Sequence, residues 1–454
     1  MLFALSTRMT IADDKQLVTY ADDVKPILRQ YCLKCHGNDE QNADLNLQSY
    51  ATLMAGGAAG AVVKAGRPAA SILYQAITNK DAAGRMPPKS PPLPAKHIAT
   101  ISAWITTGLR ESKSSQPLKT QQTLTFRPQT NAGLKPNGPP AMPQKLAALD
   151  SPDTRRPLSI LALATSPWAP LAAASGHQHI RLFHTETETE IGRLPFPEGI
   201  PHVLKFSANG ALLLAAGGKP GHSGSLRLYD VKSGSVIGRY GDELDTVIAA
   251  GISPDQKIVA LGGPGRIVKA YSTENGKPLY QITRHTDWIT AIAFSPDGKQ
   301  IASSDRAGNL YLSNARGGGI LLSLVNHKAA IRSLSWRSDS RLLASAGEDG
   351  RLIWWDAQSG FVAMQNSGAH PPHRPAGFTG TLPNGVLSIA FRRDGLIAST
   401  GRDNHLRVWK TNSQQPFAKP LPSGTPIQVA IGYKGKKHIV GDSLGILHFW
   451  TIDP

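Results

Sequence analysis

The carboxyl-terminal two thirds of the chain repeats itself, and this periodicity constrains the fold more than any other feature. The run Ala-Phe-Ser-Pro-Asp-Gly at residues 293–298 is the cleanest copy of a first marker. Its phenylalanine position recurs at steps of 41, 46, 42, 42, 55 and 40 residues, in Thr165, Phe206, Ile252, Phe294, Trp336, Phe391 and Ile431. A second marker follows each of these after 18 to 23 residues, in Phe183, Tyr229, Tyr271, Ser313, Trp355, Trp409 and Trp450. A period near 42 residues, with four short strands in each unit, predicts an all-β propeller of seven blades over residues 156–454.

Repeat five carries polar residues at positions suited to a buried hydrogen-bond network. Trp355 is followed by Asp356, and His327, Ser345 and Asp349 precede it in the same repeat. Such a network satisfies polar groups that would be costly to bury alone. These residues resemble WD repeats, and the resemblance implies that the propeller is of the WD type.

The other repeats depart from this pattern, although their spacing persists. In repeat four, Asp305 is shifted along the chain relative to the aspartate of repeat five, and Ser313 stands where repeat five has its tryptophan. Repeat seven lacks the histidine. The extra length before repeat six, at residues 367–383, indicates a loop insertion. Repeat seven ends after its third strand, so an upstream segment is expected to supply the fourth, either residues 122–126 or those just before Pro157.

Residues 13–115 are expected to form a small all-α unit. Helical spacing of apolar residues predicts helices over residues 22–31, 71–78 and 96–108. Residues 116–155 contain seven prolines and few apolar residues, which is typical of a linker. The fold class is therefore multidomain, with a helical unit followed by the propeller.

The chain has only two cysteines, Cys32 and Cys35, and His36 follows them directly. In a Cys-x-x-Cys-His motif the two thiols add across the vinyl groups of haem and the histidine binds the iron. A zinc site would need four ligands, and the nearest further histidine is His97. A thioredoxin-like redox pair would follow a strand, whereas residues 22–31 have the apolar spacing of a helix. The motif predicts one covalently bound haem c.

Met86 is the best candidate for the second axial ligand of the iron. It lies 50 residues after His36, on a proline-rich loop that leads into the helix expected at residues 96–108. Ligation by histidine and methionine raises the reduction potential of a haem. Met54 and His97 are the alternatives within this unit, and an open sixth position is another.

Residues 20–110 resemble the planctomycete-type cytochrome c domain, through residues 24–28, 32–36 and 85–89 and through Trp104-Ile105. Members of that family can carry WD repeats after this domain, so the resemblance covers most of the chain. It implies that Cys32 and Cys35 anchor haem and that His36 and Met86 are its axial ligands. It also implies that Trp104 packs beside the haem pocket, although a core role would serve equally well.

These observations predict a c-type cytochrome that transfers single electrons and is an electron carrier and binding protein, not an enzyme. The propeller is expected to act as a protein-interaction platform, with redox proteins and a protein ligand on its face as partners. One alternative is a haem enzyme whose open sixth position reacts with peroxide or oxygen. Another is a propeller scaffold with a structural or regulatory haem domain. The sequence identifies neither the electron donor and acceptor nor a substrate.

Charge and hydropathy limit the other partners. The net charge of +17 is spread over the chain, with +3 in residues 13–115 and +10 in residues 156–454, and no five Lys or Arg are consecutive. Nucleic acid is therefore not an expected partner. The sequence contains no run of 18 apolar residues, so it predicts no membrane-spanning helix. Because haem is attached to this motif outside the bacterial cytoplasm, we expect a periplasmic or cell-surface location, although residues 1–12 make only a weak or truncated export signal.

Other candidate ligands and catalysts are weak. Two pairs of histidines are interpreted as solvated or turn residues, and two acids as turn and cap residues. These are His177 with His179, His370 with His373, Asp245 and Asp287.

Overall fold

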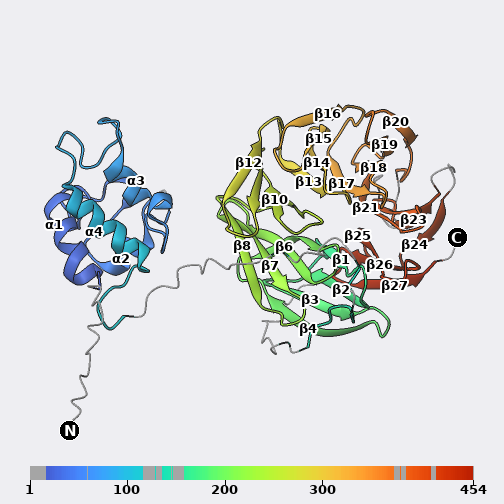
Figure 1. Ribbon diagram of the computed structural model, residues 1–454, viewed down its shortest axis with the longest axis horizontal. Coiled ribbons are helices and arrows are strands. Elements are labelled where there is room, and N and C mark those ends of the chain that lie inside the picture. The colour runs from blue at the N-terminus through green and yellow to red at the C-terminus, as the bar shows by residue number, and fades with distance from the viewer. Residues whose placement is uncertain are drawn as a thin grey trace, which may run out of the picture. The chain divides into compact units, whose positions relative to one another are not determined.

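The computed structural model divides the chain into two compact units, Met1–Gln122 and Thr123–Pro454 (Figure 1). It describes residues 17–58, 60–115, 128, 135–136, 138–144, 146, 158–372, 379, 385–410 and 416–452. The division falls inside the expected linker, residues 116–155, most of which lies outside the described residues. The exact bounds of the linker therefore remain a prediction.

The first unit is helical, as its apolar spacing predicts. A π-helical turn leads directly into the first α-helix. Pro26 lies in the first turn of this α-helix, the position at which proline is best tolerated. The second α-helix was not expected from the sequence, and it begins at a capping box formed by Ser49 and Thr52. The helical elements are η1 (Tyr20–Val24), α1 (Lys25–Tyr31), η2 (Asn42–Asp44), α2 (Tyr50–Ala55), η3 (Pro68–Ala70), α3 (Ile72–Thr78) and α4 (Ala95–Thr106).

One hydrophobic core holds these helices together. Leu28 of α1, Leu53 of α2 and Ile105 of α4 are fully buried in it. Trp104 is also fully buried, with its ring centroid 6.0 Å from that of Tyr20, and its Nε1 donates to the Arg110 carbonyl at 2.9 Å. The structure thus places Trp104 in the core.

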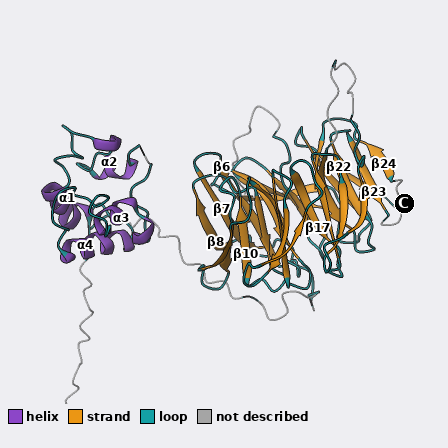
Figure 2. Cartoon of the chain, turned by 90° about the horizontal axis from the view of Figure 1, so that it is seen from above, coloured by secondary structure: helices purple, strands orange, loops and turns teal. Residues whose placement is uncertain are grey.

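The second unit is a seven-bladed β-propeller, as the repeats predict, and Figures 1 and 2 show its blades around a common axis. Each blade is an antiparallel sheet whose strands follow one another in chain order from the inside outward. The strands of blades one to three are β1 (Leu163–Thr165), β2 (Leu171–Ser175), β3 (His179–His184), β4 (Thr189–Pro195), β5 (Ile200–Phe206), β6 (Leu212–Lys219), β7 (Ser223–Asp230), β8 (Val236–Glu243), β9 (Ala249–Ile252), β10 (Ile258–Gly262), β11 (Val268–Ser272) and β12 (Pro278–Ile282). Those of blades four to seven are β13 (Ile289–Phe294), β14 (Gln300–Asp305), β15 (Leu310–Asn314), β16 (Ile320–Leu324), β17 (Ile331–Trp336), β18 (Leu342–Gly347), β19 (Leu352–Asp356), β20 (Val362–Asn366), β21 (Val386–Phe391), β22 (Ile397–Gly401), β23 (His405–Trp409), β24 (Phe417–Pro420), β25 (Pro426–Ile431), β26 (Lys437–Asp442) and β27 (Leu447–Thr451).

Blade seven contains three strands among the described residues, β25 to β27. The segments expected to supply a fourth strand, residues 122–126 and those just before Pro157, lie outside the described residues. Blade one is nevertheless joined to blade seven, because the Ile160 N–H donates to the Asp442 carbonyl at 3.0 Å. The Gln428 amide also donates to the Leu161 carbonyl at 2.9 Å. These bonds connect the first and last blades of the ring.

The hydrogen-bond network expected in repeat five is present in blade five. His327 Nδ1 lies 3.1 Å from the Asp349 carboxylate, and Nε2 lies 2.7 Å from Ser345 Oγ. The Trp355 indole N–H donates to the same hydroxyl at 2.8 Å. The network links the loop before the inner strand to the second and third strands of the blade, so it fixes the packing of all three.

Blade six has an equally complete network, which overturns the interpretation of His370 as a solvated or turn histidine. His370 is fully buried, 2.6 Å from Asp403 Oδ1 and 2.7 Å from Ser399 Oγ. The Trp409 indole N–H donates to Ser399 Oγ at 2.8 Å. The insertion before β21 separates His370 from its partners along the chain. For this reason the sequence pattern did not relate the histidine to Asp403 and Ser399. His373, its supposed partner, lies outside the described residues.

Blade four keeps part of the network despite its departures. His285 Nδ1 lies 3.0 Å from Asp305 Oδ2, and Nε2 lies 2.8 Å from Ser303 Oγ. The shifted Asp305 therefore still reaches the histidine. Ser313, which replaces the tryptophan, has a buried hydroxyl without a partner among the described residues.

A buried histidine in blade seven predicts a loss of stability in acid. Burial, followed by the charge of Arg392, lowers the pKa of His438 to about 4. The unfolded chain binds a proton on this histidine near pH 6.5 and the folded chain does not, so stability falls as the pH drops from 6.5 towards 4. His438→Gln is expected to reduce the loss between pH 7 and pH 4.5 by about 2–3 kcal/mol, measured by urea unfolding.

The matched control for this prediction is His222→Gln, because His222 is exposed. The control should keep the full acid dependence of the wild-type protein. An unchanged acid dependence in His438→Gln would show that His438 is not the titrating group.

Candidate haem site

The Cys32 to His36 segment forms one tight turn at the end of α1. The Cys32 N–H continues the helix by donating to the Leu28 carbonyl at 2.8 Å. The N–H groups of Cys35 and His36 then both donate to the Cys32 carbonyl, at 3.2 and 3.0 Å. This turn keeps the two half-buried cysteines and the histidine close together. Main-chain hydrogen bonds therefore arrange the motif residues.

Gly37, the residue after the motif, is required by the same turn. A Cβ at this position would lie 2.4 Å from the Leu33 carbonyl oxygen, which is a backbone atom. No side chain fits there without opening the turn. The glycine therefore belongs to the local structure that holds His36, although the sequence alone did not indicate this role.

His36 is fixed by its main chain, while its ring lacks a partner on one nitrogen. Its carbonyl accepts from the Leu47 N–H at 2.8 Å, and it forms an isolated β-bridge with Gln41. Its Nδ1 is buried with no hydrogen-bond partner among the described residues. A buried polar nitrogen without a partner is unusual in a folded chain, and it frequently marks a functional group.

The two cysteines are free thiols, and Cys32 packs against the hydrophobic core. Burial, followed by the effect of Cys35, raises the pKa of the Cys32 thiol to about 11. Cys32 therefore keeps its proton at neutral pH. On a haem vinyl group such a thiol would form one C–S bond, and its hydrogen would go to the neighbouring carbon.

Met86 lies on the loop between α3 and α4, as expected from the sequence. Its N–H donates to the Ala76 carbonyl at 3.0 Å, which attaches the loop to α3, and its side chain is 41% exposed. Among the alternatives, Met54 packs against the core, and the ring centroid of His97 lies 5.6 Å from that of Tyr31. Ligation of iron by Met86 remains a prediction. Of the three candidates, Met86 is the most exposed residue.

Arg85, next to Met86, was not singled out by the sequence patterns. Its Nε is buried without a hydrogen-bond partner among the described residues. The arginine is thus a cation that a carboxylate of a bound cofactor could satisfy. The free thiols of Cys32 and Cys35 and the unpartnered His36 nitrogen fit a covalently attached haem.

The other candidate residues behave as expected of turns. The carboxylate of Asp245 accepts from the Gly221 and Thr246 N–H groups at 2.8 and 2.6 Å, and that of Asp287 accepts from the Trp288 N–H at 2.7 Å. His179 Nδ1 lies 2.7 Å from the His177 carbonyl. Over the described part of the chain, no group of three or more His, Cys, Asp or Glu could hold a metal ion. Nor is any described helix long and apolar enough to cross a membrane.

Comparison with known families agrees with both halves of the structure. Residues 32–90 match the family model described as Planctomycete cytochrome C. Residues 276–312, 318–356 and 376–410 match the WD domain, G-beta repeat. No curated protein matches the chain. The protein thus has a cytochrome c-type domain joined to a β-propeller. More particularly, it has a planctomycete cytochrome C domain followed by WD40 repeats that form a seven-bladed propeller.

Two of the three matched WD40 repeats, at residues 276–312 and 318–356, are offset from the blades by one strand. The repeat at residues 318–356 begins at β16, the outer strand of blade four, and ends with β19, the third strand of blade five. Each of these two repeats therefore joins strands of two adjacent blades, whereas the match at residues 376–410 covers β21 to β23 of blade six alone. Blades one, two and seven lie outside the matched segments.

Proposed function

We propose that this protein is a c-type cytochrome that transfers single electrons through one haem attached to Cys32 and Cys35. The observation that carries the proposal is the turn in which the Cys32 carbonyl accepts from both Cys35 and His36. That turn brings together two thiols and an imidazole whose Nδ1 lacks a partner among the described residues. The match of residues 32–90 to the cytochrome family supports the same conclusion.

Each residue of the site would have a distinct task. Cys32 and Cys35 would hold the porphyrin edge by thioether bonds, and His36 would bind the iron as proximal ligand. Met86 would bind the opposite side of the iron. The bound haem would supply one-electron exchange at its iron. The chain itself would be required only to hold the cofactor, set its potential and exclude competing ligands.

The exposure of Met86 bears on the rival function, a haem enzyme with an open sixth position. A Met86→Ala variant is expected to lower the reduction potential by on the order of 100 mV, because axial ligands set haem potentials over about 0.8 V. The ferrous variant should also bind carbon monoxide rapidly, whereas the ferrous wild-type protein should not. Spectroelectrochemistry and carbon monoxide difference spectra measure both effects.

Met54→Ala is the matched control, since it removes a half-buried methionine side chain that packs against the same core. It should leave both the potential and the carbon monoxide response unchanged. Rapid carbon monoxide binding by the wild-type protein would favour the haem enzyme over the electron carrier.

For the propeller, we propose the role of a docking platform for proteins, including redox partners of the cytochrome. WD40 propellers are typical protein-binding folds, and large apolar side chains are exposed on the outer strands of blades three to six. We take the outer strands that carry these side chains as the proposed contact region. The side chains are Leu279 of β12, Ile320 and Leu321 of β16, Phe361 and Val362 near and in β20, and Phe417 of β24.

We also propose a periplasmic or cell-surface location, because attachment of haem to this motif takes place outside the bacterial cytoplasm. Fractionation of the native host tests this directly. The haem-stained protein should appear in the periplasmic or surface fraction, and its recovery with cytoplasmic proteins would contradict the proposal.

A further inference from the structure

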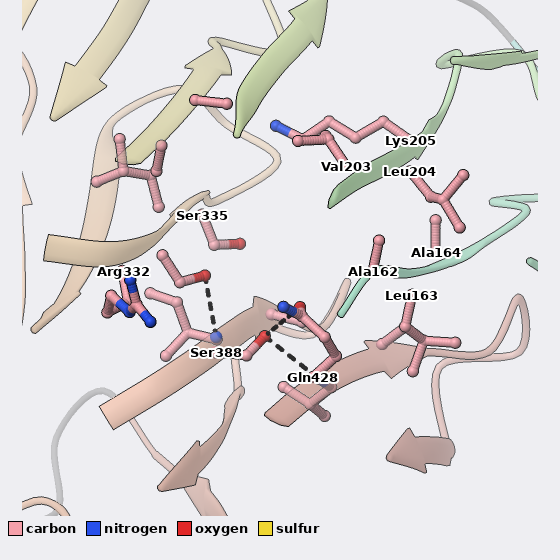
Figure 3. A pocket seen from close by; sticks show the side chains of 18 of the residues that line it. Ala162, Leu163, Ala164, Val203, Leu204, Lys205, Arg332, Ser335, Ser388 and Gln428 are labelled. Atoms are coloured by element: carbon pink, nitrogen blue, oxygen red, sulfur yellow. Dashed lines mark hydrogen bonds between the residues drawn. The ribbon is translucent and has the colours of Figure 1, made fainter. Parts of the chain in front are cut away.

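The inner strands of the seven blades surround a cavity of about 420 Å³ at the centre of the propeller. Figure 3 shows part of its lining, in which side chains from several blades point towards one another. The cavity belongs to the propeller alone and is distinct from the haem site. Its chemistry is set by the few polar side chains that reach it.

A single long cation enters this cavity. The penultimate residue of each inner strand is small in six blades and lysine in blade two, in the order Ala164, Lys205, Gly251, Ala293, Ser335, Ala390 and Ala430. Figure 3 shows the Lys205 side chain extending from β5 into the cavity. Its Nζ donates to the Ile292 carbonyl on β13, two blades further on, at 2.5 Å. Four of these small residues, Ala164, Ser335, Ala390 and Ala430, line the cavity together with Lys205.

The charge of Lys205 is not balanced by any acid that lines the cavity. The other lining residues with a basic side chain are His202 and Arg332, and none of the lining residues is Asp or Glu. Arg332 is paired outside the ring with Glu348, whose carboxylate also accepts from Arg402. A carbonyl oxygen is a neutral acceptor, and it uses one of the three N–H donors of an ammonium group. Burial of a cation without a counter-charge is unfavourable.

Two serine hydroxyls add hydrogen-bond donors to the same cavity. Ser333 Oγ accepts from the Ile389 N–H at 3.1 Å, and Ser335 Oγ accepts from the Phe391 N–H at 3.0 Å. Each hydroxyl accepts from the main chain through its oxygen, which leaves its proton to be donated to something else. Ser388 differs, because its hydroxyl donates to the Gln428 side chain at 3.2 Å. The cavity therefore offers one cation without an acidic partner, Lys205, and the hydroxyl protons of Ser333 and Ser335.

We propose that the central cavity of the propeller binds a small oxyanion, a phosphate or a carboxylate, through the Lys205 ammonium and the hydroxyls of Ser333 and Ser335. An oxyanion supplies several acceptor oxygens and the missing negative charge at once. Charge-assisted hydrogen bonds of this kind are about twice as strong as neutral ones. Water could satisfy the donors but leaves the charge unbalanced, which is why an anion is the better occupant.

The proposal predicts a defined pH dependence. Burial lowers the pKa of Lys205 to about 8. Of the other groups that face the cavity, His202 has a pKa lowered by burial and is neutral above pH 7, and Arg332 stays charged. Affinity for a fully ionised anion should therefore change little between pH 7 and 8. Above pH 8 it should fall about tenfold for each pH unit.

Titration calorimetry on the full-length, haem-loaded protein tests the site, with inorganic phosphate and acetate as probes at fixed ionic strength. The wild-type protein should show one saturable site for phosphate, acetate or both. Lys205→Met should weaken binding at least tenfold. The control Lys257→Met removes an exposed lysine before β10 and should bind as the wild-type protein does.

Ser335→Ala provides a second variant that leaves the lysine in place and should weaken binding several-fold. If Lys205→Met does not fold, this variant and the pH profile of the wild-type protein decide the question. Binding of phosphate alone would identify a tetrahedral oxyanion, and binding of both probes would identify a general carboxylate and phosphate site. Absence of binding, affinity that does not change above pH 8, or equal affinity in Lys205→Met would overturn the proposal.

Discussion

A chain carrying both Cys32→Ser and Cys35→Ser is expected to lose covalent haem completely. The chain has only these two cysteines, so no other thiol can form a thioether bond. The turn itself should persist, because it is built from main-chain bonds to the Cys32 carbonyl that serine can also make. Mass spectrometry of the intact denatured protein should find the mass of the bare polypeptide, whereas the wild-type protein carries the added mass of one haem.

The single variant Cys35→Ser is the informative control for this result. One thioether bond can still form, so part of the protein should retain haem, with a shifted absorbance because one vinyl group remains unreacted. Haem that survives denaturation in the double variant would contradict the assignment of these cysteines. Normal haem loading in His36→Ala, with unchanged spectra, would contradict the role of the histidine.

Asp403→Ala is expected to destabilise the propeller by about 3–5 kcal/mol, because removing one member of a buried ion pair leaves its partners uncompensated. Asp403 accepts from His370 Nδ1 at 2.6 Å and from the Arg407 guanidinium Nε at 3.1 Å. Burial alone would raise the pKa of Asp403, but the hydrogen bonds from His370 and Arg407 and their charge lower it overall. Burial lowers the pKa of His370. A neutral His370 can thus donate through Nδ1 to Asp403 and accept through Nε2 from Ser399.

Urea unfolding of the full chain measures this loss in the propeller transition. The matched control is Glu186→Ala, which removes an acid that pairs at 3.5 Å with Lys434 on the surface. Exposed pairs of this kind contribute about 0–1 kcal/mol. A loss in Asp403→Ala no larger than that in Glu186→Ala would show that the network in blade six is not needed for stability.

The blade count and the strand order were predictable because the inner-strand and third-strand markers recur in every blade. All seven inner strands end at the first marker, from Thr165 in β1 to Ile431 in β25. The helices of the first unit were predictable from apolar spacing, apart from α2. That helix has only six residues, and its start depends on the Ser49–Thr52 capping box more than on any periodic pattern.

The network of blade six was not predictable, because it joins residues that the loop insertion separates. His370 and Asp403 are 33 residues apart, whereas His327 and Asp349 of blade five are 22 apart. Spacing alone therefore could not relate His370 to its partners. Lys205 was missed for a related reason, since its environment depends on residues of other blades, such as Ile292 on β13.

For the candidate haem site the sequence named the residue types, and the structure adds their arrangement. The motif identified Cys32, Cys35 and His36, but not the turn that Gly37 permits or the unpartnered His36 nitrogen. Arg85 was not singled out because a lone arginine on a loop has no periodic or motif signal. Only its buried Nε shows that it differs from an ordinary surface arginine.

Haem staining of the denatured protein, purified from its native host, tests the central claim most directly. The account predicts a haem band that migrates with the full-length polypeptide after boiling in detergent, because thioether bonds survive denaturation. A polypeptide of full length with no haem band would contradict the account and leave the propeller as the functional part of the protein.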